Sequence, residues 1–181
     1  MKQPRYISLL RGINLLGHKK ITMTELRALY ESLGFKGAQT YIQSGNVLFD
    51  APETDIAALV HRIEKKIRLR LGYDVSVIIR TAEEMRKIVE KNPFAGEEAN
   101  KLHATFLDEN PNLFPAAEVD KVRDKAERFH HSGREIYLFL PNGYGRTKLN
   151  NNFFERKLKV TATTRSWRTV VALAEMVETV R

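Results

Sequence analysis

Glycine, asparagine and cationic side chains gather near the start of the chain, in residues 11–20. Gly12 and Asn14 tolerate left-handed or tightly turned backbone, so several N–H groups of this segment can point at one spot. Arg11 and Lys19 add positive charge beside them. The combination predicts a cradle for an anionic group such as a phosphate or a carboxylate.

The same segment departs from the common nucleotide-binding loop. The spacing from Gly12 to Gly17 imitates G-x-x-x-x-G-K-[ST], but His18 stands where the lysine belongs and Lys19 stands where the hydroxyl residue belongs. A nucleoside triphosphate site is therefore not expected. The alternative interpretation is a flexible loop with solvated lysines, because most loops only connect elements.

Two later segments carry similar chemistry. Residues 142–148, NGYGRTK, follow a predicted strand and open a predicted helix, where Arg146 and Lys148 would strengthen an anion site made by backbone amides. Arg165 lies two residues before Trp167, and arginine beside an aromatic ring can stack on bases. Trp167 also falls in the apolar stripe of the last predicted helix, so we predict that it belongs to the core. A plain connection is the alternative for residues 142–148.

The candidate nucleophile, Ser44, and the candidate base, His103, have no catalytic partner that the sequence identifies. Ser44 and Asn46 flank a predicted sharp turn, where a serine could attack a substrate, but the G-x-S-x-G pattern is absent and Ser-Gly-Asn suits a hairpin turn. His103 is the best candidate for a general base, and a structural histidine is the simpler interpretation. The sequence identifies no catalytic residue.

Composition sets further limits. The 181 residues carry a net charge of +8, contain no cysteine and include five histidines without metal-ligand spacing, so we expect neither a metal nor a cofactor. No apolar run approaches the roughly 18 residues of a membrane span, and the N-terminus lacks the apolar region of a signal peptide. We therefore expect a cytoplasmic protein.

The positive charge lies at the two ends of the chain. Residues 1–36 carry seven Lys and Arg against two acids, residues 134–181 carry nine against four, and residues 37–133 carry fourteen against sixteen. If the two ends meet in space, their combined field favours an anionic ligand, either a small molecule or nucleic acid. If they lie apart, the charge only favours solubility.

The N-terminal elements alternate in a familiar order. A strand at 7–10 precedes a helix at 23–33, two strands at 38–43 and 47–50, a helix at 55–72 and a strand at 75–79. This is the ferredoxin-like βαββαβ arrangement, whose helices cover one sheet face. We expect the other face to be covered by later parts of the chain or to bind a partner.

The C-terminal elements are predicted less regularly. They are a helix after Thr81, a strand at 102–108, a helix starting near Pro115, a hairpin at 129–131 and 135–140, and helices at 148–158 and 165–180. We therefore predict an α+β protein with a ferredoxin-like subdomain in residues 1–80 and a smaller α+β subdomain in residues 81–181 that ends in two helices. The two halves share no more than a faint echo of strand and helix order.

Four segments together resemble the bacterial family catalogued as domain of unknown function 1697. They are LLRGIN at 9–14, YIQSGNVLF at 41–49, NGYGRTKLNN at 142–151 and TATTRSWRTV at 161–170. The resemblance implies a two-subdomain α+β fold with a ferredoxin-like N-terminal part, and no established activity, substrate or catalytic residue. Relatives typically carry RNW near the end, where this chain has Ser166 between Arg165 and Trp167, and often carry SK where this chain has Thr147 and Lys148.

Our leading hypothesis is a protein that binds an anionic small molecule in a cleft between its subdomains. The predicted ligand-binding residues are Arg11, Gly12, Asn14, Lys19, Ser44, Asn46, Arg146, Lys148 and Arg165. A basic nucleic-acid-binding protein is one alternative, because the βαββαβ order matches an RNA-recognition fold, although the first strand lacks the aromatic residue that stacks on bases. A small-molecule enzyme using Ser44 or His103 and a protein interaction module without catalysis are the others. The sequence does not predict an oligomeric state.

Overall fold

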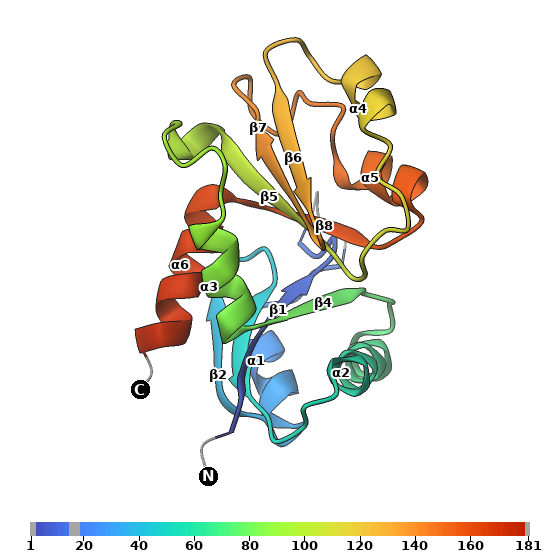
Figure 1. Cartoon of the computed structure of the whole chain (residues 1–181). Coiled ribbons are helices and arrows are strands. Elements are labelled where there is room, and N and C mark those ends of the chain that lie inside the picture. The colour runs from blue at the N-terminus through green and yellow to red at the C-terminus, as the bar shows by residue number, and fades with distance from the viewer. Residues whose placement is uncertain (1–2, 15–18, 180–181) are drawn as a thin grey trace. The chain divides into compact units, whose positions relative to one another are not determined.

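The computed structural model describes residues 3–14 and 19–179 (Figure 1). A first four-stranded sheet has the strand order β2-β3-β1-β4, and every neighbouring pair is antiparallel. Its elements are β1 (Arg5–Leu10), α1 (Met23–Glu31), β2 (Lys36–Tyr41), β3 (Asn46–Asp50), α2 (Ile56–Leu71) and β4 (Val77–Thr81), followed by α3 (Ala82–Glu90). This order confirms the predicted ferredoxin-like N-terminal fold.

The helices of this part begin and end where their capping residues predict. Thr22 and Glu25 form a reciprocal capping box at the start of α1. The carboxylate of Asp55 accepts hydrogen bonds from Ala57 and Ala58 at the start of α2, and Gly72 ends that helix in the left-handed conformation.

Both faces of the first sheet are buried. On one face, alternate residues of β1, β3 and β4 pack against apolar residues of α1 and α2 such as Leu29 and Ile63. On the other face, Ile7, Leu9 and Leu48 are 0% exposed. Those residues therefore offer no open surface on which bases could stack, so the predicted nucleic-acid alternative would need another surface.

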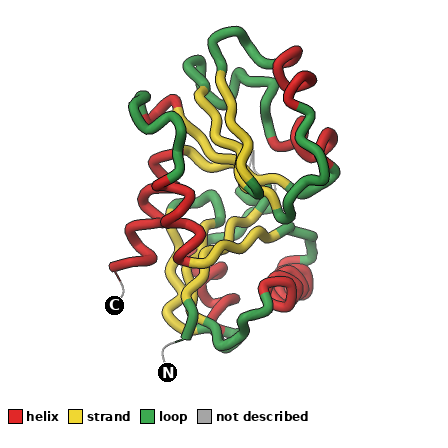
Figure 2. Tube along the Cα trace, in the orientation of Figure 1, coloured by secondary structure: helices red, strands yellow, loops and turns green. Residues whose placement is uncertain are grey.

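The second sheet has the strand order β6-β7-β5-β8 and is also antiparallel throughout. Figure 2 shows the helices, strands and loops of the chain by colour. A short 3₁₀ helix (Ala99–Lys101) leads into it. Its elements are β5 (Leu102–Leu107), α4 (Ala116–Val122), β6 (Arg128–Ser132), β7 (Glu135–Phe139), α5 (Asn151–Leu158) and β8 (Ala162–Ser166), followed by α6 (Trp167–Thr179).

Strand β8 corrects the prediction for the end of the chain. The sequence predicts a helix from residue 165 onward and a C-terminal part that ends in two successive helices, whereas β8 lies between α5 and α6. The strand is short and polar, so it lacks an apolar alternation long enough to predict a strand. Trp167 is 8% exposed, which confirms its prediction as a core residue.

The two sheets repeat one topology. Each arises from the order strand, helix, strand, strand, helix, strand, and each last strand runs directly into a helix. Ile7 pairs with Arg80 across β1 and β4, as Ala104 pairs with Arg165 across β5 and β8. Arg80 and Arg165 are 0% and 7% exposed, so both copies bury an arginine at the same register position.

Contacts divide the chain into two units. The first unit contains residues 1–85 and 173–181, and the second contains residues 86–172, so α3 and α6 each belong partly to both. Sequence analysis divided the chain after residue 80, and that domain assignment stays a prediction. In the described residues, no helix combines the length and apolar character needed to cross a membrane.

Candidate functional site

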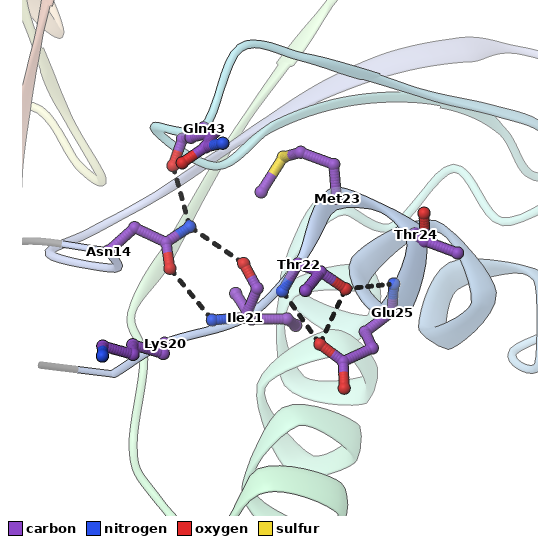
Figure 3. Close-up of a pocket in the computed structure, with 8 residues that line it drawn as sticks. All are labelled: Asn14, Lys20, Ile21, Thr22, Met23, Thr24, Glu25 and Gln43. Carbon is purple, nitrogen blue, oxygen red and sulfur yellow. Dashed lines mark hydrogen bonds between the residues drawn. The ribbon is translucent and has the colours of Figure 1, made fainter. Parts of the chain in front are cut away.

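Asn14 ties the loop after β1 to two other segments of the first unit (Figure 3). Its side-chain oxygen accepts the N–H of Ile21 at 2.9 Å, and its side-chain nitrogen donates to the carbonyls of Ile21 at 3.0 Å and Gln43 at 2.9 Å. The backbone of Asn14 has a φ of 54°, which asparagine tolerates better than most residues. This predicted ligand residue therefore holds the entry to α1 and the β2–β3 hairpin together.

The tip of the β2–β3 hairpin is fixed from inside. The side-chain nitrogen of Asn46 donates to the carbonyl of Tyr41 and to the hydroxyl of Ser44, both at 2.9 Å. Gly45 has a φ of 77°, and a Cβ there would lie 2.7 Å from a methyl carbon of Ile13. The predicted residues Ser44 and Asn46 thus shape the turn, and only glycine fits between them.

Asn14 and Gln43, which one hydrogen bond joins, border a cavity of about 660 Å³ in the first unit. The hydroxyl of Thr24, the ammonium of Lys20 and the amide of Gln43 have no hydrogen-bond partner among the described residues, and all three side chains are exposed. The cavity is lined by Asn14, Lys20, Ile21, Thr22, Met23, Thr24, Glu25 and Gln43.

The charges at the cavity are separated. The carboxylate of Glu25 accepts the backbone N–H of Thr22 at 2.9 Å and its hydroxyl at 2.7 Å, and these bonds lower the pKa of Glu25. Lys20 and Glu25 lie on opposite sides of Ile21 and Thr22 (Figure 3). The cavity can therefore offer a positive group on one side and hydrogen-bond acceptors on the other. The contact between the hydroxyl of Thr22 and the carboxylate of Glu25 belongs to the capping box of α1.

The remaining predicted residues of the first unit lie in the same loop but make other contacts. The backbone N–H of Arg11 donates to the carbonyl of Ser76 at 2.9 Å, and the ammonium of Lys19 donates to the carbonyl of Asp74 at 2.5 Å. Gly12 has a φ of 70°, as predicted for a tightly turned loop. Gly17 and His18 lie outside the described residues.

In the second unit, Arg146 and Lys148 are exposed. The prediction that they stand at a helix N-terminus is wrong, because Asn150 caps α5 and the helix begins at Asn151. The N–H of Arg146 closes a turn onto the carbonyl of Gly143 at 3.2 Å. Their role in anion binding stays a prediction.

Arg165 and His103 lie on neighbouring strands of the second sheet. Arg165 donates to the hydroxyl of Thr163 at 2.8 Å and to the carbonyl of Thr164 at 3.0 Å, and burial lowers its pKa to about 10, so it stays charged near neutral pH. Burial also lowers the pKa of His103, whose ring stacks on Tyr144 with 5.4 Å between centroids. A neutral imidazole suits a general base, but no activated nucleophile is seen beside it among the described residues.

Of the eight residues that line the cavity, only Asn14 is among the residues predicted to bind the ligand. Lys20 belongs to the cationic segment 11–20 from which the sequence predicts an anion cradle, whereas the sequence does not mark Thr24 or Gln43 as a ligand contact. Thr24 follows the capping residue Thr22 by two positions, and this start of a helix directly after a cationic loop was the available signal. In the described part of the chain, no three His, Cys, Asp or Glu side chains gather in a group that could hold a metal ion.

Comparison with known proteins places the chain in a family. Residues 3–137 match the model of a family described as a protein of unknown function, DUF1697. No curated protein matches the sequence. Among solved structures, the conserved bacterial protein SP0830 from Streptococcus pneumoniae is similar in fold, with a TM-score of 0.72 and 24% sequence identity over 97% of this chain and 99% of that one. The motifs at 9–14 and 41–49, which contribute Asn14 and Gln43 to the cavity, fall within the matched region, and the chain belongs to the DUF1697 family.

Proposed function

We propose that this protein binds a small anionic ligand, carrying a phosphate or a carboxylate, in the cavity of the first unit. The supporting observation is that Lys20, Thr24 and Gln43 border one cavity without hydrogen-bond partners among the described residues. Lys20 supplies the positive charge, and the hydroxyl and the amide supply neutral donors.

The segments around the cavity support this proposal because side-chain hydrogen bonds hold them together. The side chain of Asn14 makes three hydrogen bonds, to Ile21 and Gln43, and the side-chain nitrogen of Asn46 donates two within the hairpin. A site whose frame is fixed before binding loses less conformational entropy when the ligand arrives. In this proposal the two asparagines position the site, and Lys20, Thr24 and Gln43 contact the ligand.

The carboxylate of Glu25 adds a preference. It lies on the side of the cavity away from Lys20, and its second oxygen is not used in the capping box. A ligand that carries a hydroxyl or ammonium group at some distance from its anionic group would satisfy both ends.

A thermal-shift titration tests the proposal, with inorganic phosphate, acetate and succinate as probes at low and high salt. Binding to the native protein raises the unfolding midpoint by mass action. Lys20→Gln should abolish most of the rise, and the matched control Lys36→Gln, at an exposed lysine on β2, should keep it. Equal rises for both variants, or no rise with any probe for the wild type, would contradict the proposal.

The other predicted roles stay proposals that rest on the sequence. They are a ligand contact for Arg11, Arg146, Lys148 or Arg165, as an alternative to the cavity of the first unit, a cytoplasmic location and the binding of nucleic acid. An oligonucleotide included in the titration separates the last of these, because counterion release would make its effect fall steeply with salt.

A further inference from the structure

Ile42, at the tip of the β2–β3 hairpin, combines two unusual properties. Its φ is 48°, in the left-handed region that a β-branched side chain rarely adopts, and its side chain is 50% exposed. Because the side chain is half exposed, its packing contributes little free energy to offset the strain of the backbone. Strain of this kind persists where the surrounding structure imposes it, and it is frequent at ligand-binding sites.

The surrounding bonds explain how the strain is held. The carbonyl of Tyr41, just before Ile42, accepts the amide of Asn46, and the carbonyl of Gln43, just after it, accepts the amide of Asn14. Ile42 is therefore fixed on both sides, by Asn46 within the hairpin and by Asn14, which lines the cavity.

The fold itself does not require this turn. The second unit closes the equivalent hairpin between β6 and β7 with residues 133–134 alone, whereas the first unit uses residues 42–45. In the second unit the left-handed position is taken by Gly133, which bears no side-chain strain. The longer, strained tip of the first unit thus needs a reason beyond sheet closure.

We propose that the ligand of the cavity is an amphipathic anion, an alkyl or aryl phosphate or carboxylate, whose apolar part contacts Ile42 and Met23. This inference rests on the proposed function and adds the class of ligand. Ile42 is not itself among the residues that line the cavity, but its neighbour Gln43 is. Half-buried Met23 also lines the cavity, and its side chain extends from the start of α1 on the side of the hairpin (Figure 3). Lys20 holds the anionic group of this ligand.

Calorimetric or thermal-shift titrations with phenyl phosphate and inorganic phosphate test the ligand class. Burial of a ring against Ile42 and Met23 should make phenyl phosphate bind about tenfold more tightly than inorganic phosphate. Equal affinities for the two compounds would overturn this inference and leave the proposed function standing. Failure of both compounds to bind would overturn both.

The variant Ile42→Gly tests the residue. Glycine removes the left-handed strain, so the unfolding midpoint of the ligand-free variant should be equal to or above that of the wild type. Phenyl phosphate should bind about fivefold more weakly to the variant, because an apolar contact is lost, while inorganic phosphate should bind unchanged. The control Leu69→Ser removes an apolar side chain of 75% exposure on α2 and should change neither affinity. A lowered midpoint for Ile42→Gly, or an unchanged affinity for phenyl phosphate, would overturn the inference.

Discussion

The two units share one sheet topology but differ in the length of the loops that connect its strands and helices. Between the first strand and the first helix, the first unit has residues 11–22 and the second has residues 108–115. The hairpin turn is also longer in the first unit, where it contains residues 42–45, than in the second, where it contains residues 133–134. The longer connections of the first unit carry the cavity and the strained isoleucine. Loops on a common scaffold are where binding residues concentrate, so this difference supports our proposal that a ligand binds to the first unit.

Both units also share a buried arginine, which we interpret as a part of the common scaffold. Arg80 and Arg165 occupy the same register position, both are buried, and each precedes a hydroxyl residue at the start of a helix. Thr81 exchanges capping hydrogen bonds with Glu84, and the hydroxyl of Ser166 lies 2.9 Å from that of Thr169. A feature repeated in both copies is more simply a part of the fold than a ligand contact, and we interpret Arg165 in this way.

The largest expected effect tests that interpretation. Arg80→Ala and Arg165→Ala should each lower the free energy of unfolding by about 2–4 kcal/mol, because each leaves buried acceptors without a donor and opens a cavity. Urea denaturation measures both values. An Arg165→Ala variant as stable as the wild type, beside a strongly destabilised Arg80→Ala, would break the equivalence of the two units.

The hairpin glycines give the next contrast. Gly45→Ala should cost about 3 kcal/mol, because its Cβ would collide with Ile13 and Leu10 in addition to the left-handed strain. Gly133→Ala has the same strain at a φ of 59° but open space around it, so it should cost about 1 kcal/mol. Chemical denaturation of the two variants compares them directly, and equal costs would show that the first hairpin is not tightly enclosed.

A smaller effect concerns the frame of the cavity. Asn14→Ala removes three hydrogen bonds between the loop, the hairpin and the entry to α1 and should cost about 1–3 kcal/mol. Asn112→Ala, in the corresponding loop of the second unit, changes an exposed side chain and should cost less than about 0.5 kcal/mol. Equal stability of the two variants would contradict the claim that Asn14 holds the loop, the hairpin and the entry to α1 together.

The smallest effect is a pH dependence in the second unit. Burial lowers the pKa of His103 in the folded protein, so the unfolded chain binds more protons below the ordinary histidine pKa of about 6.5. His103 therefore makes the protein less stable as the pH falls through and below that value. His103→Gln should flatten the fall of the unfolding midpoint between pH 7 and pH 5, and His61→Gln, at an exposed position on α2, serves as the control. Parallel curves for the wild type and His103→Gln would contradict this assignment.

The sequence predicted the first unit better than the second for physical reasons. Thr22 with Glu25, Asp55 and Gly72 mark helix ends through local hydrogen bonds and backbone preference, which a sequence displays directly. Strand β8 is short and polar, and its strand pairing with β5 depends on residues some 60 positions away, which local patterns do not reveal. Without β8, the repeat of topology stayed hidden.

For the candidate site, the sequence located the segments but not the roles. Residue types marked Asn14, Ser44 and Asn46 as special, yet only the structure shows that their polar groups bond to the protein itself. The partners of Asn14 lie 7 and 29 positions away, so its role could not be deduced from spacing. Lys20, Thr24 and Gln43 became candidates only because folding brings them to one cavity.

A two-dimensional ¹H–¹⁵N NMR titration of the whole chain with phenyl phosphate tests most directly whether the longer connections of the first unit bind the ligand. We predict saturable shift changes at Lys20, Thr24 and Gln43, with the resonances of Arg146 and Lys148 unchanged. Shift changes confined to residues 142–148, or none in either unit up to millimolar ligand, would contradict this account.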